Sequence, residues 1–331
     1  MKIAILGAGV VGLSTAVQLR QLLPTAELDL IAEKFYDETT SYGAAGIFRP
    51  TLSKTPGVEI ERIKKWLKDS WKHYEGIFHG DEARLAGVQL ISGYQFVNNP
   101  QPNPLERDIV FSYRALTDKE LSAFPGDRFK YGWFVTTLLI EPRIYLKYLT
   151  DKFTQSGGRT IRKTLESFEE LCGRYDLVIN CMGLGSKELL KDEELVPNRG
   201  HLVKVKCDWL KHFVYTGDTG TCYILPGIEV TTIGGTRTDN DLDLTPRKED
   251  TERILNEAYK VLPSLKKAKI VSEWVGLRPH RAPLRIESET MEFPSGKKLQ
   301  VVHNYGHGAE GISLSWGTSV EAVELAMRLV K

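Results

Sequence analysis

The sequence has few cysteines, almost no net charge and no long apolar run, and each absence excludes a class of protein. Its four cysteines form no Cys-x-x-Cys pair, so a disulfide framework or a zinc cluster is not expected and a reducing compartment fits better. The formal net charge is +1, from 44 Lys plus Arg and 43 Asp plus Glu. We therefore expect neither nucleic acid nor a membrane surface as a partner. No stretch reaches the roughly 18 apolar residues of a membrane-spanning helix, which predicts a soluble, intracellular protein.

The N-terminal segment has the pattern of a strand–helix–strand unit. Hydrophobic residues make up 41% of the 331-residue chain, enough for a large core in one or two domains. Residues 2–6 are a short apolar run typical of a buried strand, and residues 10–23 have apolar positions at helical spacing as far as Pro24. Residues 27–32 predict a second strand. This order and length match a dinucleotide-binding unit.

The rest of the chain predicts an α/β architecture in which distant segments join the first sheet. Helices are expected at 57–78, 142–154, 247–262 and 311–330, and strands at 88–97, 129–140 (as a pair), 176–181, 268–272, 301–304 and within 200–237. The runs that end at Cys181 and Asn304 have the character of central strands. We therefore expect a discontinuous nucleotide-binding domain of residues 1–50, 140–185 and 270–331, with a second, substrate domain of residues 51–139 and 186–269.

Gly7-Ala8-Gly9-Val10-Val11-Gly12 is a G-x-G-x-x-G motif between the first strand and the first helix. Gly7 allows the tight turn, Gly9 lets the backbone approach a pyrophosphate, and Gly12 lets the helix pack against the strand. A phosphate would then lie at a helix N-terminus, where free N–H groups favour an anion. Glu33, at the end of the second strand, is suited to bind ribose hydroxyls; the alternative is a solvated strand end.

The segment from His303 to Gly311, HNYGHGAEG, distinguishes between the cofactors that the first motif allows. It runs from a strand into the last helix, and its glycines allow a close approach of backbone to a ligand. The helix dipole suits the negative charge of a reduced isoalloxazine, and Ser313 adds a hydroxyl donor. The alternatives are an ordinary glycine-rich connection and a metal site from His303 and His307. No H-E-x-x-H motif is present, so no metal is expected.

Arg278 lies in Gly276-Leu277-Arg278-Pro279-His280-Arg281, where Pro279 favours extended backbone at Arg278. A guanidinium there would bind a substrate carboxylate through two parallel hydrogen bonds. The alternative is a surface salt bridge. The sequence contains no evident Ser/His/Asp pattern, Walker motif or paired-carboxylate signature, and no side chain is assigned as a catalytic acid or base.

Six motifs occur along nearly the whole chain in the order of one known family: AILGAGVVGLSTA, AAG at 44–46, LISGY at 90–94, VINCMGLGS, VGLRPHR and HNYGHGAEGIS. Together they resemble the D-amino-acid oxidases. GGTR at 234–237 and CMGLGS are similar to the D-aspartate oxidase branch. The resemblance implies an α/β fold with a Rossmann-type FAD-binding domain and a β-rich α+β substrate domain.

The resemblance also implies noncovalent FAD and a set of binding residues. Arg278 would bind the substrate α-carboxylate and Tyr223 would add a hydroxyl hydrogen bond; read alone, Tyr223 is a half-buried strand aromatic. The predicted cofactor-binding residues are Gly7, Ala8, Gly9, Val10, Val11, Gly12, Glu33, Lys34, Thr39, Thr40, Ser41, Gly46, Ile47, Met182, Gly183, Arg278, Gly308, Ala309, Gly311, Ile312 and Ser313.

The family's reaction, carried over as an expectation, transfers a hydride from the substrate Cα to flavin N5 without a side-chain base. The imino acid hydrolyses to a 2-oxo acid and ammonia, and dioxygen yields hydrogen peroxide; the protein supplies orientation and electrostatics. Peroxisomal location follows only from kinship, because the chain ends Leu329-Val330-Lys331 without a peroxisomal tripeptide. Cytoplasm is the alternative, and a homo-oligomer is left open.

Arg237 and Arg49 predict an acidic substrate, such as D-aspartate or D-glutamate. Some acidic-substrate relatives have an Arg where Thr216 stands, and Arg49 would replace it. Alternatively, Arg237 pairs with Asp239 or Asp241 and the enzyme oxidises neutral D-amino acids. The stretch from Tyr215 to Cys222 is shorter than the active-site lid of many neutral-substrate relatives. A sarcosine- or glycine-type amine oxidase, an NAD-dependent dehydrogenase and an inactive binding protein with this fold are the competing hypotheses.

Overall fold

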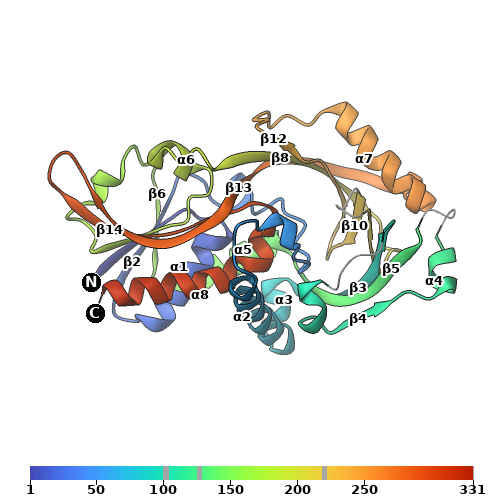
Figure 1. Cartoon of the computed structure of the whole chain (residues 1–331), viewed down its shortest axis with the longest axis horizontal. Helices are drawn as coiled ribbons and strands as arrows, with labels where there is room; N and C mark the ends of the chain where they lie inside the picture. The colour runs from blue at the N-terminus through green and yellow to red at the C-terminus, as the bar shows by residue number, and fades with distance from the viewer. Residues whose placement is uncertain (100–103, 125–128, 218–221, 331) are drawn as a thin grey trace.

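The computed structural model describes residues 1–99, 104–124, 129–217 and 222–330. Within these ranges one long mixed sheet extends through the molecule, with helices on both of its faces (Figure 1). Its order is β4-β5-β3-β9-β10-β11-β8-β13-β14-β7-β1-β2-β6, and β12 pairs with β8. None of the helices in the described ranges is long and apolar enough to cross a bilayer.

The strands alternate with helices along much of the chain. The strands are β1 (Lys2–Leu6), β2 (Glu27–Ala32), β3 (Val88–Val97), β4 (Ser112–Ala115), β5 (Tyr131–Ile140), β6 (Arg159–Arg162), β7 (Leu177–Asn180), β8 (Val196–Lys206), β9 (Phe213–Thr216), β10 (Cys222–Pro226), β11 (Thr231–Gly234), β12 (Thr238–Asp239), β13 (Lys269–Glu292) and β14 (Lys298–His307). The helices are α1 (Val10–Leu22), α2 (Ile60–His79), α3 (Ala83–Ala86), α4 (Asp118–Ser122), α5 (Pro142–Gln155), α6 (Gly185–Leu190), α7 (Lys248–Val261) and α8 (Gly311–Leu329). The short 3-10 turns η2 (Leu52–Lys54) and η6 (Gly308–Glu310) lie beside the site described below.

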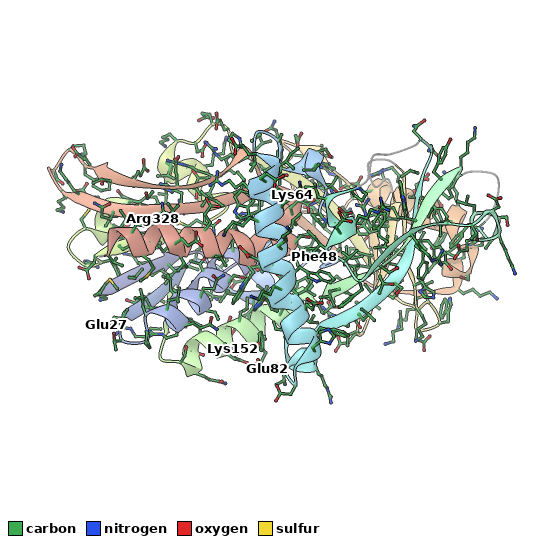
Figure 2. The ribbon with its side chains drawn as sticks, turned by 60° about the horizontal axis from the view of Figure 1, so that its bottom comes forward. Glu27, Phe48, Lys64, Glu82, Lys152 and Arg328 are labelled. Atoms are coloured by element: carbon green, nitrogen blue, oxygen red, sulfur yellow. The ribbon has the colours of Figure 1, made fainter. Side chains whose placement is uncertain are left out.

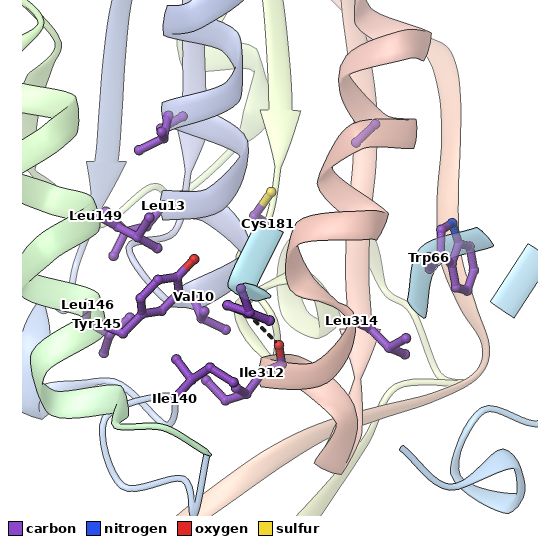
Figure 3. Close-up of a cluster of buried hydrophobic side chains, with 14 of the residues drawn as sticks. Val10, Leu13, Trp66, Ile140, Tyr145, Leu146, Leu149, Cys181, Ile312 and Leu314 are labelled. Carbon is purple, nitrogen blue, oxygen red and sulfur yellow. Dashed lines mark hydrogen bonds between the residues drawn. The ribbon is translucent and has the colours of Figure 1, made fainter. Parts of the chain in front are cut away.

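One half of the sheet is parallel, in the order β6-β2-β1-β7-β14. β1 is its centre: Ile3 is the partner of Leu28 on β2 and of Leu177 on β7. A strand buried on both faces needs a continuous apolar run, and residues 3–6 are fully buried. In Figure 3, side chains of α1, α5 and α8 meet in one apolar cluster that includes Val10, Leu13, Tyr145, Leu149, Ile312 and Leu314. This is the expected Rossmann-type arrangement.

Helix α2 crosses α8 (Figure 2), and a glycine allows the two backbones to approach. A Cβ at Gly317 would lie only 2.0 Å from the carbonyl oxygen of Trp66. The amide N–H of Gly317 donates to Ser70 Oγ at 2.9 Å. The two ends of this layer are also joined by polar contacts, such as the ion pair of Glu82 with Lys152 at 2.7 Å, both labelled in Figure 2.

The other half of the sheet is largely antiparallel and is covered by α7 near β8 and β13 (Figure 1). Side chains alternate along β8, as the pleat requires. Arg199 and His201 face α7, where Arg199 Nη1 donates to Asp250 Oδ2 at 2.7 Å and a His201 ring nitrogen lies 3.7 Å from the same atom. Asn198 and Gly200 face the opposite side and contact Arg278. The strand thus forms the floor of the site described below.

The expected fold class is confirmed, while some element boundaries were wrong. Residues 129–140 are not a strand pair: β5 is one strand, with β3 on one side and β4 on the other. The strand expected at 268–272 continues to Glu292, because β13 pairs first with β8 and then, after a register shift between His280 and Arg285, with β14. Of the lid stretch from Tyr215 to Cys222, residues 218–221 lie outside the described residues, as does Lys331.

Candidate active site

A cavity of about 760 Å³ runs from the glycine turn after β1 to β10 and β13. All predicted cofactor-binding residues except Gly12 line this cavity, as do Arg278, Tyr223, Arg237 and Arg49. Residues of the first helix, the loop at 39–47, the turn after β7 and the start of α8 therefore border one space. They come from segments up to about 300 positions apart, which only the sheet order brings together.

The glycine turn has the geometry that a phosphate-binding turn needs. Gly7 has φ +96°, and a Cβ there would lie 2.6 Å from the carbonyl oxygen of Cys181. A Cβ at Gly12 would lie 1.8 Å from the Gly7 carbonyl oxygen, so Gly12 acts by packing α1 on the turn and does not border the cavity. Helix α1 begins after Gly9 without a side-chain cap, and its first N–H group, of Val10, donates to Ser41 Oγ at 3.0 Å.

Glu33 and Lys34 lie at the carboxyl end of β2, at the edge of the cavity. Both are exposed, and no ion pair of the Glu33 carboxylate occurs among the described residues. Its backbone carbonyl accepts from Arg162 Nη1 at 2.9 Å. Residues 163–165, after β6, also border the cavity. Sequence reasoning missed them because no motif marks this short edge strand.

The loop at 39–47 and the turn after β7 form the middle of the cavity. Gly46 has φ +83°, and a Cβ there would lie 2.1 Å from the Ile140 carbonyl oxygen. The hydroxyl of Thr40 donates to the Leu277 carbonyl at 3.1 Å, which ties this loop to β13. On the other side, Met182 and Gly183 follow β7, and Gly183 has φ +56°. Each glycine stands where a side chain would fill the cavity or strain the backbone.

At the far end, the cavity borders the start of α8. Gly308 has φ +55°, and α8 begins at Gly311 without a side-chain cap, which leaves backbone N–H groups at the cavity wall. Asn304 is fully buried beside the cavity, and in the described structure neither polar atom of its side chain has a partner. A buried amide without partners costs free energy, so the site suits a ligand with polar groups.

The two histidines considered as metal ligands are engaged elsewhere. The His303 ring bonds Asn180 Nδ2 at 3.1 Å and Glu289 Oε1 at 2.7 Å, while His307 Nε2 bonds Thr318 Oγ1 at 2.9 Å. Burial lowers the pKa of His307 to about 3, so its ring is neutral. In the ranges that the structure describes, no cluster of His, Cys, Asp or Glu is arranged to hold a metal ion.

Arg278 has no acidic partner among the described residues. Its Nη1 donates to Asn198 Oδ1 at 2.9 Å and to the carbonyl oxygens of Thr236 at 3.2 Å and Arg199 at 3.5 Å. No such bond is recorded for Nε or Nη2, which leaves one edge of the guanidinium for a ligand. Burial lowers the pKa of Arg278 despite the attraction of Tyr223, yet an arginine stays charged at neutral pH. The surface salt bridge considered as an alternative does not occur.

Tyr223 lies beside Arg278 on β10. Its ring packs where a side chain at Gly234 would be, since a Cβ there would lie 2.0 Å from Tyr223 Cζ. The ring stacks on Tyr215, with centroids 5.3 Å apart, and the Arg49 guanidinium lies 4.5 Å from the Tyr215 ring centre. Burial raises the pKa of Tyr223 although Arg278 acts against the shift, so the hydroxyl keeps its proton and can donate.

Arg237 borders the cavity with an exposed side chain and has no hydrogen bond or ion pair in the described part of the chain. The two acids considered as its partners are bound elsewhere. Asp239 Oδ1 accepts from Asn198 Nδ2 at 2.5 Å, and Asp241 pairs with Arg247 at 2.6 Å.

Lys54 adds a cation that the sequence did not single out. Its Nζ lies 3.5 Å from Glu310 Oε1, and burial lowers its pKa, with smaller contributions from the positive charges of Arg49, Arg237 and Arg278. Thr216 does not line the cavity; its hydroxyl donates to the Cys222 carbonyl at 3.4 Å. Four cations therefore surround the cavity near Tyr223, with Glu310 as the acid paired to one of them.

Comparison with known proteins agrees with this geometry. The model of a family described as FAD dependent oxidoreductase matches residues 2–325. A D-aspartate oxidase of Homo sapiens is 40% identical over 99% of this chain and 95% of its own length. A D-amino acid oxidase of Dugesia ryukyuensis is 33% identical, covering 98% of this chain and 97% of its own length.

Solved structures extend the similarity of the fold. The glycine oxidase of Geobacillus kaustophilus has a TM-score of 0.77 at 17% identity, over 98% of this chain and 94% of that one. The L-proline dehydrogenase of P.horikoshii has a TM-score of 0.75 at 14% identity, over 99% of this chain and 93% of that one. At these identities the likeness concerns the fold alone.

Proposed function

The chain belongs to the FAD-dependent oxidoreductase family, and from this premise we propose that it oxidises D-amino acids, with D-aspartate and D-glutamate preferred. The products are a 2-oxo acid, ammonia and hydrogen peroxide. The observation that carries the proposal is Arg278, a charged fork beside the cavity with one edge free and no acidic partner in the described chain. The similarity to a D-aspartate oxidase over nearly the full length supports the same substrate.

The residues that line the cavity fit FAD. Its length from the glycine turn to Tyr223, the uncapped starts of α1 and α8, and the unpartnered Asn304 amide suit an elongated ligand with phosphates at one end and polar ring atoms at the other. When bound, FAD supplies the acceptor for two electrons. The turn at 7–11 would hold the pyrophosphate, Glu33 the ribose, and the segment 308–313 the ring system.

The protein's own side chains would bind and orient the substrate. The free edge of Arg278 would bind the α-carboxylate through two charge-assisted hydrogen bonds, and the Tyr223 hydroxyl would donate a third. Arg237, with Arg49 nearby, would bind the side-chain carboxylate. No side chain is assigned to remove a proton. The contribution of the chain is to hold the Cα–H bond in a fixed direction and to keep bulk water out.

Several parts of the proposal are supported by the family resemblance alone. In them, dioxygen accepts the electrons, the protein is located in peroxisomes, and the chain divides into an FAD-binding domain (1–50, 140–185 and 270–331) and a substrate domain (51–139 and 186–269). Oxygen consumption, cell fractionation and limited proteolysis test these three parts in turn. Sedimentation of the purified protein tests whether it forms a homo-oligomer.

Oxidation of neutral D-amino acids is the second candidate. It is favoured by the exposure of Arg237, which a neutral substrate would leave in contact with water at little cost, and by the similarity to a D-amino acid oxidase.

The deciding experiment is a substrate panel. Purified protein is supplied with FAD, and peroxide release is measured with D-aspartate, D-glutamate, N-methyl-D-aspartate, D-alanine and L-aspartate, while the bound cofactor is identified after denaturation. FAD in the extract and the highest kcat/KM for an acidic D-enantiomer are expected. Bound NAD, or no turnover of any D-amino acid, would contradict the proposal, and a preference for D-alanine would establish the second candidate.

A further inference from the structure

Asn198 lies between an arginine and an aspartate on three neighbouring strands. It sits on β8, directly opposite Arg278 of β13 on one side and Asp239 of β12 on the other. Its side chain is 1% exposed. Oδ1 accepts from Arg278 Nη1 at 2.9 Å, and Nδ2 donates to Asp239 Oδ1 at 2.5 Å. The amide can take only this orientation, because a guanidinium only donates and a carboxylate only accepts.

Asp239 would otherwise be well placed to pair with Arg237. The two residues are separated by Thr238 alone, and at this spacing on extended backbone their side chains leave on the same side. Both act on the ring of His280: burial lowers the pKa of His280, Arg237 lowers it further and Asp239 raises it. The next acid along the chain, Asp241, is held by Arg247. Asp239 is thus the carboxylate that Arg237 would meet first.

We propose that Asn198 is a specificity-determining residue, which binds Asp239 and so leaves Arg237 unpaired for the second carboxylate of the substrate. The inference rests on the proposed function, since it concerns the choice between acidic and neutral D-amino acids. It gives Asn198 two separable effects. Its carbonyl orients Arg278, which matters for every substrate, whereas its amide N–H group restrains Asp239, which matters only for substrates with an acidic side chain.

The two effects separate when two substrates are compared. In Asn198→Ala, kcat/KM is expected to fall for both D-aspartate and D-alanine, because Arg278 loses an acceptor. The fall should be about tenfold greater for D-aspartate, since the released Asp239 competes with the substrate for Arg237. In the double variant Asn198→Ala with Asp239→Ala, the ratio of the two kcat/KM values should return to within about threefold of wild type, while the common loss persists.

A binding measurement gives the same separation without turnover. Succinate and propionate differ by one carboxylate, and their Kd values are measured by calorimetry on the FAD-loaded protein. Asn198→Ala should weaken succinate about tenfold more than propionate, and removal of Asp239 should restore the difference. Asn256→Ala, the same substitution at an exposed site on α7, is the matched control and should change neither ratio.

A variant without a cavity covers the case in which Asn198→Ala does not fold. Asp239→Asn removes the competing charge at nearly constant volume, and the preference for D-aspartate should stay the same or rise. A lower preference in Asp239→Asn, an unchanged ratio in Asn198→Ala, or a double variant that fails to restore the ratio would each overturn the proposal. Failure of the proposed function is visible earlier, in wild type, as the absence of any preference for D-aspartate over D-alanine.

Discussion

The guanidinium of Arg278 lies directly over the backbone of Gly200 on the neighbouring strand. A Cβ at position 200 would be 2.3 Å from Arg278 Nη2 and 2.4 Å from Cζ. The clash would be with the far end of a flexible side chain, so the arginine can move while the backbone stays. A methyl group at Gly200 should therefore displace the carboxylate-binding fork without preventing folding.

Gly200→Ala is accordingly expected to lower kcat/KM for all D-amino acids by roughly 10–100-fold, because a shift of about 1 Å in a binding group costs that much in rate. The midpoint of urea unfolding should change little. The control is Gly76→Ala on α2, where an added Cβ meets no atom within 4 Å and alanine favours the helix. Equal kinetics in Gly200→Ala and wild type would contradict the assigned position of the Arg278 fork.

Removing the fork itself should have a larger effect. Arg278→Ala is expected to lower kcat/KM by roughly 10²–10⁴-fold for every D-amino acid, since a charge-assisted pair of hydrogen bonds is lost. Tyr223→Phe removes one neutral donor and should cost less than Arg278→Ala. The visible absorption spectrum of bound FAD should persist in both variants. If Arg278→Ala turns over D-alanine as wild type does, another residue binds the α-carboxylate.

How far the sequence predicts this site depends on how local each signal is. The roles of Gly7 and Gly12 follow from one turn and its neighbours, and Arg278 is marked by the proline after it. Lys54 and Asn198 carry no such local signal. Asn198 reaches Asp239 only because β12 adds to the edge of β8, a pairing across 41 positions that no periodicity in the chain indicates.

The length of β13 was missed for a related reason. Its residues look irregular because the strand changes partner from β8 to β14 near His280, so no single pattern of buried and exposed positions extends along all of it. Local pattern therefore predicted the cofactor half of the cavity well, and long-range strand register determined the substrate half.

His307 makes the stability of the fold depend on pH. Burial lowers its pKa to about 3 in the folded state, whereas an unfolded histidine titrates near 6.5. Between these values the unfolded chain binds more protons, so stability is fully present above about pH 6.5 and is lost as the pH falls toward 3. At pH 5 this single group is expected to cost about 2 kcal/mol.

The measurement compares urea unfolding at pH 7 and pH 5 in wild type and in His307→Gln, which keeps an amide donor near Thr318. The variant should lose about 2 kcal/mol less stability between the two pH values. The comparison between proteins removes the contribution of the carboxylates, which titrate alike in both. The same loss in both proteins would show that His307 is already accessible to protons in the folded state.

The choice of substrate depends most directly on Arg237. In the described structure its side chain is exposed and unpaired, Asp239 is bound by Asn198, and Asp241 is bound by Arg247. Because water already surrounds the Arg237 side chain, a neutral substrate incurs no large penalty for leaving it unpaired, and the preference must come from the attraction of a second carboxylate. A partly exposed charge-assisted hydrogen bond stabilises by about 1.5 kcal/mol, which corresponds to roughly tenfold in kcat/KM. Arg237→Ala should therefore reduce the ratio of kcat/KM for D-aspartate to that for D-alanine by about tenfold, mainly through KM for D-aspartate, while D-alanine is nearly unaffected. The effect should shrink as ionic strength rises, since salt screens an exposed pair more than a buried one. Arg84→Ala, at an exposed position on α3, is the control for loss of a positive charge and should leave the ratio unchanged. If Arg237→Ala leaves the ratio as it is in wild type, the distal carboxylate is bound elsewhere, and Arg49 and Lys54, which border the same cavity, are the next residues to substitute.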